Sequence, residues 1–365
     1  MYKNKLIRLG IERKSLMSNK LNKESVIEIL RTVNDPELNR DLVSLNMIKD
    51  VVVENGKVSL SVVLTTPACP LKNQIKNDVK NAIEKLEGVV DIKINMSAVV
   101  PQDKAILNKG NKSLKNIIAI SSGKGGVGKS TVAVNIAVAL ANAGSKVGLM
   151  DADIYGPNIP TMMGLSKLPQ PKDGKLIPAE AFGVKVISIG FLIKDGQPLI
   201  WRGPLLHSTI KQFIEDVEWG ALDYLVVDLP PGTGDVQLSL SQHIPVTCGV
   251  VVTMPQQVSV DDASRGIEMF QKLGIPIAGV VENMGGLDLP DGTVINVFGS
   301  GGGEDMANKY SLNFLGRVPL DPDIRISGDL GKPIVVDNPN AKVSVIFKDI
   351  AGKIAAYISQ LDLNK

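Results

Sequence analysis

The 365-residue sequence contains only two cysteines, two histidines and 4% aromatic residues. Cys69 and Cys248 cannot build a disulfide framework, which fits a reducing compartment, and we expect a cytoplasmic protein. His207 and His243 are too few for the histidine-containing zinc fingers. Because aromatic residues are scarce and do not alternate with basic ones, we expect no stacking platform for single-stranded nucleic acid.

An excess of one charge and long apolar runs are lacking as well. The 40 Lys and Arg residues nearly balance 38 Asp and Glu residues, which leaves a formal net charge of +2. Bulk electrostatics therefore indicate neither nucleic acid nor an anionic membrane as a partner. Apolar runs such as 246–254 and 277–281 are far shorter than the roughly 20 residues that a membrane-spanning helix needs. We expect neither nucleic acid nor a membrane among the partners.

Residues 1–23 are basic, with Glu12 as their only acidic residue. They lack the apolar core and the small-residue cleavage site of a secretory signal. Three interpretations stay open for residues 1–20, namely a disordered basic extension, an organelle transit peptide, or a chain whose natural start is Met17.

Residues 21–100 have the pattern of a small α/β domain, because helical periodicity alternates in them with strand patterns. The residues that follow, 101–115, are polar, rich in lysine and without periodicity, which is typical of a linker. The expected elements of the small domain are a helix over 24–33, a hairpin that turns at Asn55-Gly56, a helix over 71–87 that ends at Gly88, and a strand over 89–96.

Residues 116–365 alternate short apolar strands with helices. Runs that are apolar on both faces are typical of a parallel sheet covered by helices on both sides. In such a sheet, ligands bind at the carboxyl ends of the strands. The expected strands cover 117–120, 146–150, 184–187, 224–227, 248–253, 277–281 and 314–317.

The most specific motif follows the first of these strands. Residues 123–131 contain two glycines, Gly123 and Gly128, with four residues between them, followed by Lys and Ser, which is the pattern of a phosphate-binding loop. Lys129 is expected to reach the β- and γ-phosphates of ATP, and the Ser130 hydroxyl is expected to coordinate Mg²⁺. The expected nucleotide-binding residues of the loop are Gly123, Lys124, Gly125, Gly126, Val127, Gly128, Lys129, Ser130 and Thr131. The fold class is therefore α/β, with a mostly parallel P-loop NTPase sheet preceded by the small α/β domain.

Acidic residues end two further strands. Asp151 and Asp153 alternate along an extended segment, so both carboxylates are expected to face the phosphates. One would organise the water shell of Mg²⁺, a role we assign to Asp151, and Asp153 would orient the attacking water. Asp228 closes the strand 224–227 and is expected to hold Mg²⁺ through water.

Two further segments lie at strand ends. The stiff loop 229–235, with its prolines and glycines, suits a backbone that senses the γ-phosphate. Asn283 could read the adenine edge, because its amide both donates and accepts hydrogen bonds; a plain turn residue is the alternative. A second lysine in the phosphate loop, Lys124, suggests that a second copy of the chain completes the nucleotide site.

These residues resemble a known family. The loop 124–130 resembles the deviant Walker A motif of the MinD/ParA/nitrogenase iron-protein class. The segments 153–160, 201–204 and 230–235 are similar to those of Mrp-type iron–sulfur cluster carrier ATPases. Asp35-Pro36-Glu37-Leu38 and residues 65–70 resemble the small iron–sulfur-assembly domain that is often fused to them.

The resemblance implies a slowly hydrolysing ATPase that acts as a homodimer and transfers a [4Fe–4S] cluster. Apo iron–sulfur proteins and iron–sulfur assembly factors are the implied partners. Lys124 would reach the nucleotide of the opposite subunit. With Lys129, it would stabilise charge in the transition state, so the expected catalytic residues are Lys124, Lys129, Asp153 and Asp228.

The sequence departs from the family at the cluster site. Relatives carry a Cys-x-x-Cys pair shortly after the segment 282–284, but residues 285–293 contain no cysteine. Asp288 and Asp291 are poor substitutes for thiolates. Cys69 precedes a helix whose N-terminus would favour the thiolate, so contact with iron or with a partner's cluster is one interpretation and a structural thiol the other. Cys248 is interpreted as a buried small hydrophobe.

Three functions are therefore compared. The leading hypothesis is an ATP-dependent carrier of iron–sulfur clusters. The second is a nucleotide-switched adaptor in cluster assembly that carries no cluster of its own, which the missing cysteine pair favours. The third is a MinD- or ParA-like positioning ATPase, which would need a membrane helix or a basic DNA-binding surface. Residues 343–363 are better interpreted as a docked surface helix.

Overall fold

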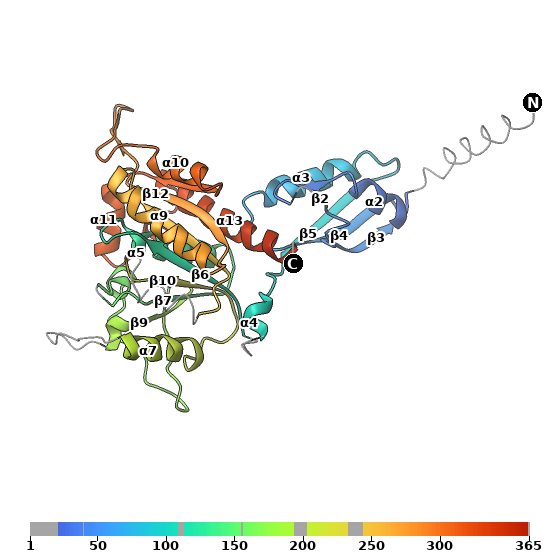
Figure 1. The fold of residues 1–365 in the computed structure, drawn as a ribbon. Coiled ribbons are helices and arrows are strands. Elements are labelled where there is room, and N and C mark those ends of the chain that lie inside the picture. The colour runs from blue at the N-terminus through green and yellow to red at the C-terminus, as the bar shows by residue number, and fades with distance from the viewer. Residues whose placement is uncertain are drawn as a thin grey trace, which may run out of the picture. The chain divides into compact units, whose positions relative to one another are not determined.

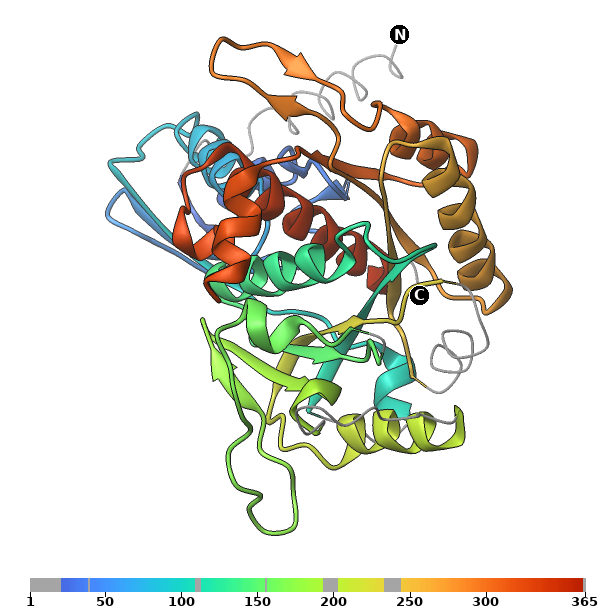
Figure 2. The same cartoon turned by 90° about the vertical axis from the view of Figure 1, so that its left-hand side faces the viewer.

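The computed structural model describes residues 21–38, 40–108, 113–154, 156–192, 203–232 and 244–363, and for residues 203–208 it describes the backbone alone. The chain forms two compact units (Figures 1 and 2). The first contains Met1–Thr65 and Cys69–Val99, and the second contains Thr66–Ala68 and Val100–Lys365. Among the described helices, none combines the length and the hydropathy required to cross a bilayer.

The first unit contains a three-stranded sheet in the order β3-β4-β5. The turn between β3 and β4 has positive φ angles at Asn55 and Gly56, 48° and 79°, which confirms the expected hairpin. Strand β5 pairs in parallel with β4, because α3 connects the two. The elements of this unit are α2 (Lys23–Leu30), β1 (Asn34–Asp35), β2 (Arg40–Asp41), β3 (Ile48–Glu54), β4 (Lys57–Leu64), α3 (Lys72–Ile83) and β5 (Asp91–Ala98).

Local side chains explain where the helices of the first unit begin and end. Asn22 accepts a hydrogen bond from the backbone of Ser25, which caps α2. Helix α3 ends at Ile83, earlier than the expected Gly88, and Gly88 follows in a turn with a φ of 87°. The apolar faces of both helices pack on the inward side chains of β4, which form the core of this unit with Val58, Leu60, Val62 and Leu64.

The second unit is built on an eight-stranded sheet in the order β15-β12-β11-β6-β10-β7-β9-β8. Its described strands pair in parallel except β8 with β9. The seven strands expected from the sequence are all present, and the short antiparallel edge strand β8 adds to them. The bounds are β6 (Leu114–Ser122), β7 (Val147–Asp151), β8 (Ala179–Ala181), β9 (Val184–Ser188), β10 (Leu222–Asp228), β11 (Cys248–Thr253), β12 (Ile277–Asn283) and β15 (Phe314–Val318).

Helices cover both faces of this sheet (Figures 1 and 2). Alternate residues of each strand enter two separate cores, which is why the strands are apolar throughout. One face carries α5 (Lys129–Asn142), α6 (Ile159–Met162), α12 (Ile334–Asp337) and α13 (Lys342–Leu363). The other face carries α4 (Lys104–Asn108), α7 (Gly203–Glu215), α9 (Gln257–Lys272) and α10 (Gly302–Lys309). The remaining elements are η1 (Ile189–Leu192), α11 (Pro322–Asp329) and the short hairpin of β13 (Leu287–Asp288) and β14 (Val294–Ile295).

The segment expected to be a linker contains helix α4. Ile106 of this helix is fully buried in the core that also contains Leu114 of β6. Strand β6 begins at Leu114, two residues before the expected start of the larger domain. One turn of helix is too short to produce a visible apolar period, so the sequence pattern could not reveal it.

The sheet brings the expected polar residues to one edge. In the parallel register, Asp228 of β10 lies between Ile120 of β6 and Asp151 of β7, and Ser188 of β9 lies beside Asp151. The phosphate-binding loop leaves β6 at the same edge. The carboxyl ends of the central strands therefore position the candidate site, as the topology rule requires.

Candidate functional site

The phosphate-binding loop joins β6 to the first turn of α5. Gly126 and Gly128 have φ angles of 81° and 80°, a conformation that glycine adopts readily, and α5 begins directly after Gly128. Among the residues that the structure describes, no side chain caps this helix end. Its first backbone N–H groups and the positive end of its dipole are thus available to an anion. The loop lines a cavity of about 350 Å³ together with the start of α5.

At two glycines of the loop, other parts of the chain approach so closely that a side chain would have no room. A Cβ on Gly123 would lie 2.1 Å from the backbone carbon of Asp262 in α9. A Cβ on Gly128 would lie 2.2 Å from Nδ2 of Asn283. By contrast, a Cβ on Gly125 or Gly126 would meet no atom of the described residues within 4 Å. The loop is therefore supported on one side and open on the other, which is a cradle that fits a phosphate group.

Lys129 lies at the floor of this cavity and contacts two carboxylates. Its Nζ is 2.6 Å from Oδ1 of Asp228 and 3.3 Å from Oδ2 of Asp153. The hydroxyl of Ser130 donates to Oδ2 of Asp228 at 2.5 Å. The structure thus brings together four residues that the sequence places at three separate strand ends, as the expected nucleotide and magnesium site requires.

The charged groups of Lys129 and Asp228 are both buried, and burial affects their pKa values. Burial opposes the charge of the Lys129 ammonium, but the carboxylates of Asp228 and Asp153 outweigh it and raise the pKa of Lys129. For Asp228, which is fully buried, burial raises the pKa while Lys129 and Ser130 act in the opposite direction. Hard oxygen ligands such as Asp228 and Ser130 fit Mg²⁺, which also would neutralise part of this negative charge.

The structure corrects the role expected for Asp151. Its side chain is fully buried and does not line the cavity. Its two oxygens accept hydrogen bonds from the Ser188 hydroxyl at 2.8 Å and from the backbone of Asp153 at 3.1 Å. Burial and the neighbouring Asp228 raise the pKa of Asp151 to about 8. Strand β7 ends at Asp151, so the alternation that would place both acids on one side stops there, and only Asp153 reaches the cavity.

Asn283 supports the loop as well as lining a cavity. Its amide nitrogen donates to the carbonyl of Val127 at 2.8 Å, and the residue is almost fully buried. The side chain therefore holds the phosphate loop in place through its donor. Reading of the adenine edge remains a prediction, and it would fall to the amide oxygen.

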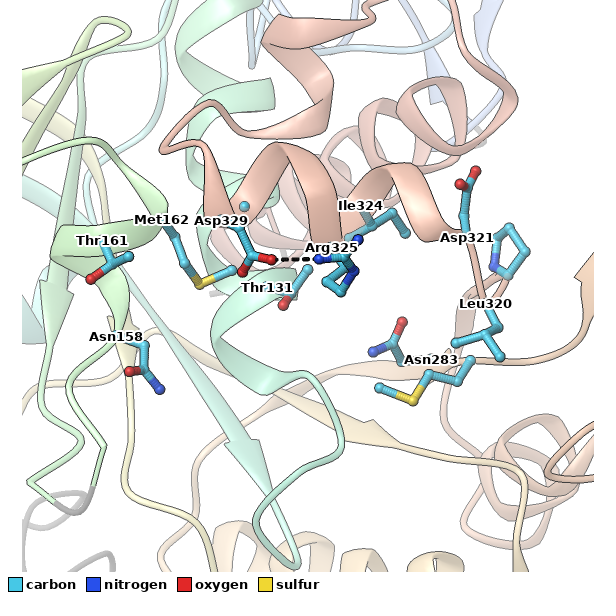
Figure 3. Close-up of a pocket in the computed structure, with 13 residues that line it drawn as sticks. Thr131, Asn158, Thr161, Met162, Asn283, Leu320, Asp321, Ile324, Arg325 and Asp329 are labelled. Atoms are coloured by element: carbon cyan, nitrogen blue, oxygen red, sulfur yellow. Dashed lines mark hydrogen bonds and ion pairs between the residues drawn. The ribbon is translucent and has the colours of Figure 1, made fainter.

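A second cavity of about 400 Å³ adjoins the first. Thr131, Asn158 and Met162 line both of them. In Figure 3, the α6 residues Thr161 and Met162 lie on the left of this second cavity, and Asn283 and Leu320 lie on the right. The labelled residues of α11 lie above the centre of the view. Apolar walls with a few polar groups are typical of sites for a flat organic ring. The lining residues are Thr131, Asn158, Thr161, Met162, Asn283, Met284, Pro319, Leu320, Asp321, Ile324, Arg325, Gly328 and Asp329.

Lys124 lines the first cavity from the rim of the loop and is partly exposed. Within the described part of the chain its ammonium forms no ion pair. Its backbone carbonyl accepts a hydrogen bond from the Ser122 hydroxyl at 3.0 Å. The carbonyl of Ser122 in turn accepts from Gly232 at 2.9 Å, so the loop after β10 is tied to the phosphate loop.

The expected thiolate at Cys69 is contradicted by its surroundings. Burial of the side chain and the charge of Glu37 raise the pKa of the Cys69 thiol to about 11, and the helix N-terminus does not compensate. The Sγ atom lies 3.9 Å from Oε2 of Glu37. Cys248 is fully buried, as expected, and burial raises the pKa of its thiol too. No group of three metal-ligating side chains occurs among the described residues.

Several expectations fall on segments outside the described residues. These are Tyr155, Trp201 and Arg202, residues 233–235, His243, the side chain of His207, and residues 1–20 with Met17. In the segment after Asn283, the structure shows the hairpin of β13 and β14, where Asp288 forms an ion pair with Lys342 at 2.5 Å and Asp291 accepts from the backbone of Thr293.

Sequence reasoning missed three features of the site and its surroundings. Ser188, which holds Asp151, ends a strand at the same edge, so the strand-end rule could have found it. The second cavity is lined by residues far apart in the chain, and no local sequence pattern predicts it. Glu282 is a further case, because its buried carboxylate pairs with Arg317 and accepts from the first turn of α10.

Comparisons with known proteins agree with these observations. Residues 113–355 match the family of the NUBPL iron-transfer P-loop NTPase, and residues 23–95 match that of the iron–sulfur cluster assembly protein. The "Iron-sulfur cluster carrier protein" of Synechocystis is 51% identical over 348 residues, which cover 92% of this chain and 98% of that protein.

Two solved structures are also similar. A nucleotide-binding protein from Archaeoglobus fulgidus in complex with ADP is 37% identical, with a TM-score of 0.55, and the match covers 62% of this chain and 90% of that one. The cell division ATPase MinD of Pyrococcus furiosus is 23% identical, with a TM-score of 0.50, covering 66% of this chain and 98% of that one. The latter shows the fold alone.

Proposed function

Because the chain belongs to the family of iron–sulfur cluster carriers with an iron-transfer P-loop NTPase domain, we propose that it binds and hydrolyses ATP as a homodimer and uses this cycle to pass iron–sulfur clusters to apoproteins. The observation that carries the ATPase part is the meeting of Lys129, Ser130 and Asp228 at the floor of an open glycine cradle. A cytoplasmic location, expected from the scarcity of cysteine, is part of the same proposal.

In this proposal the loop amides and the N-terminus of α5 bind the phosphates. Lys129 exchanges its contact with Asp228 for the β- and γ-phosphate oxygens, which frees that carboxylate. Ser130 and Asp228 would then hold Mg²⁺, which when bound neutralises charge on the phosphate oxygens. Asp153, the only acid of its pair that lines the cavity, orients the attacking water.

The nucleoside would occupy the second cavity. The two cavities share Thr131, the last residue of the phosphate-binding segment 123–131, so a nucleotide can extend from one into the other. The complex of the A. fulgidus relative with ADP supports the binding of an adenine nucleotide. Lys124, unpaired among the described residues and at the rim of the first cavity, is placed to act on the nucleotide of a second chain.

In this proposal the iron–sulfur cluster is the cargo, and the chain offers few cysteines to bind it. The chain has only Cys69 and Cys248, and Cys248 is sealed in the core of the second unit. One chain therefore offers Cys69 alone as an accessible thiol, and that thiol is held protonated next to Glu37. This observation favours a second candidate function, a nucleotide-switched adaptor that organises cluster assembly without holding a cluster.

Anaerobic reconstitution with iron and sulfide separates the two functions. The wild type is compared with Cys69→Ala, and Cys248→Ala serves as the matched control because its thiol is buried. The carrier function predicts bound iron and sulfide and activation of an apo-acceptor enzyme, both reduced in Cys69→Ala and retained in Cys248→Ala. If the wild type hydrolyses ATP but binds no cluster and activates no acceptor, the carrier function is wrong and the adaptor stands.

A further inference from the structure

Two helices that wall the second cavity end in the same way. Helix α6 is followed by Gly164 with a φ of 64°, and α11 is followed by Gly331 with a φ of 70°. Each glycine occupies the left-handed position that closes a helix at its C-terminus. In sequence these two positions are far apart, and neither belongs to the phosphate-binding motif.

The two glycines lie backbone against backbone. A Cβ on Gly331 would lie 2.6 Å from Cα and 2.8 Å from N of Gly164, and 3.1 Å from the carbonyl oxygen of Thr161. In the other direction, a Cβ on Gly164 would lie 3.0 Å from the carbonyl oxygen of Gly331. Because the obstacles are main-chain atoms and not flexible side chains, no other residue fits unless the helices separate.

The same two helices supply much of the cavity wall. Thr161 and Met162 of α6 and the α11 residues Ile324, Arg325 and Asp329 line neighbouring parts of the cavity in Figure 3. The helices are also in contact beyond the glycines, since a Cβ on Gly328 would lie 3.7 Å from Cε of Met162. Because α6 and α11 are neighbours in the lining, moving them apart would lengthen the wall that they form and enlarge the cavity.

We propose that the Gly164–Gly331 contact is a spacer that sets the width of the base-binding cavity and so determines how large a base the protein accepts. The inference rests on the proposed function, because it takes the second cavity to bind the nucleoside of ATP. Both glycines are positioning residues, since neither is required to touch the nucleotide.

Gly331→Ala is the direct test. Its Cβ must move from 2.6 Å to at least the 3.4 Å at which ordinary contact begins, so the helix ends must separate by about 0.8 Å. Such a displacement should weaken ATP binding by roughly tenfold, because the cavity wall loses close contact with the base. The phosphate loop is held separately by Asp262 and Asn283, so binding of inorganic tripolyphosphate should stay within about twofold.

The matched control is Gly274→Ala. Gly274 also follows a helix, α9, and has a φ of 66°, but a Cβ there meets no atom within 4 Å. It therefore reproduces the strain of a left-handed alanine without the steric wedge. We expect its nucleotide affinities to equal those of the wild type.

The measurement is calorimetric binding of ATP, N6-benzyl-ATP and tripolyphosphate to each variant. In Gly331→Ala, the preference for ATP over the bulky N6-benzyl-ATP should fall by about tenfold, because the widened cavity admits the added ring. Equal loss of all three ligands, or an unchanged preference, would overturn the spacer role. If Gly331→Ala does not fold, Gly164→Ala is the alternative test. Its Cβ would lie 3.0 Å from the nearest atom, so the clash is milder, and we expect the same change in preference to be smaller. A wild type that binds no ATP refutes the proposed function instead.

Discussion

The ammonium of Lys129 and the carboxylate of Asp228 form a buried ion pair at 2.6 Å, with exposed side-chain fractions of 5% and 0%. Ser130 completes the contact from the first turn of α5. Buried charges are costly unless they are paired, so each partner of this pair stabilises the other before any nucleotide arrives. The residues that would bind phosphate and Mg²⁺ are thereby positioned in advance.

The first prediction follows from this pairing. Lys129→Met should lower the free energy of unfolding by about 3–5 kcal/mol, because it leaves the carboxylates of Asp228 and Asp153 buried without their cation. Adding Asp228→Asn should recover much of that loss, and neither variant should bind ATP. Denaturant unfolding of the two single variants and the double variant measures the coupling.

The exposed pair of Lys342 and Asp288 provides the control for this cycle. Its atoms lie 2.5 Å apart, but the side chains are 72% and 40% exposed, so solvent screens the interaction. The corresponding cycle of Lys342→Met and Asp288→Asn should give a coupling of at most about 1 kcal/mol. Additive effects at Lys129 and Asp228 would contradict the prediction.

The second prediction concerns two glycines of the phosphate loop that look equivalent in the sequence. Gly123→Ala should lower the melting temperature and abolish ATP binding, because its Cβ would lie 2.1 Å from the backbone of Asp262. Gly125→Ala should leave the melting temperature of the nucleotide-free protein unchanged, since its Cβ meets no atom within 4 Å in the part of the chain that the structure describes. Thermal unfolding of both variants tests this, and equal melting temperatures would be the contrary result.

The sequence revealed those parts of the molecule that are encoded locally. The strands of the large sheet, the phosphate loop and the acids Asp153 and Asp228 follow from short patterns, and the parallel topology alone brings strand ends together. The Asn283 contact with Val127 joins residues 156 positions apart, and no short pattern encodes it. The second cavity likewise combines α5, α6, α11 and the end of β12.

Two expectations failed for identifiable physical reasons. The alternation rule was applied to Asp151 and Asp153 across the end of β7, where the extended geometry stops. The thiolate at Cys69 was inferred from the helix that follows it, whereas Glu37, 32 residues earlier in the chain, contributes a like charge that opposes ionisation. The end of a strand thus decided the first outcome, and a neighbour far along the chain contributed to the second.

The third prediction is the pH dependence of Cys69. A thiol reacts as the thiolate, so a pKa raised to about 11 means that alkylation at pH 8 should be slow and should accelerate as the pH approaches 11. Glu37→Gln removes the neighbouring negative charge, lowers the pKa and should speed alkylation at pH 8 by several-fold, about half a pKa unit or more. Glu54→Gln, in the same unit, is the control and should change nothing.

Iodoacetamide labelling followed by peptide mass spectrometry measures this rate for Cys69 separately from Cys248. Cys248 should be labelled only after unfolding, because it is fully buried. If Cys69 in the wild type reacts as fast as a free cysteine at pH 8, the burial and the charge of Glu37 do not control its ionisation, and the expected thiolate is restored.

The last prediction concerns Lys124 and the second chain. Lys124→Ala should retain ATP binding within about twofold but lower ATP turnover by at least about 100-fold, as does removal of a charge-stabilising group in other phosphoryl-transfer sites. Asp153→Ala should also lose turnover, because it lacks the residue that orients water.

If Lys124 acts on the nucleotide of the opposite chain, a mixture of the two inactive variants forms hybrid dimers with one complete site. That site has Asp153 from one chain and Lys124 from the other, so the mixture should regain part of the wild-type turnover. A control mixture with the double variant Lys124→Ala and Asp153→Ala should remain inactive. No recovery in the first mixture, with dimers demonstrated by light scattering, would place Lys124 in its own chain's site.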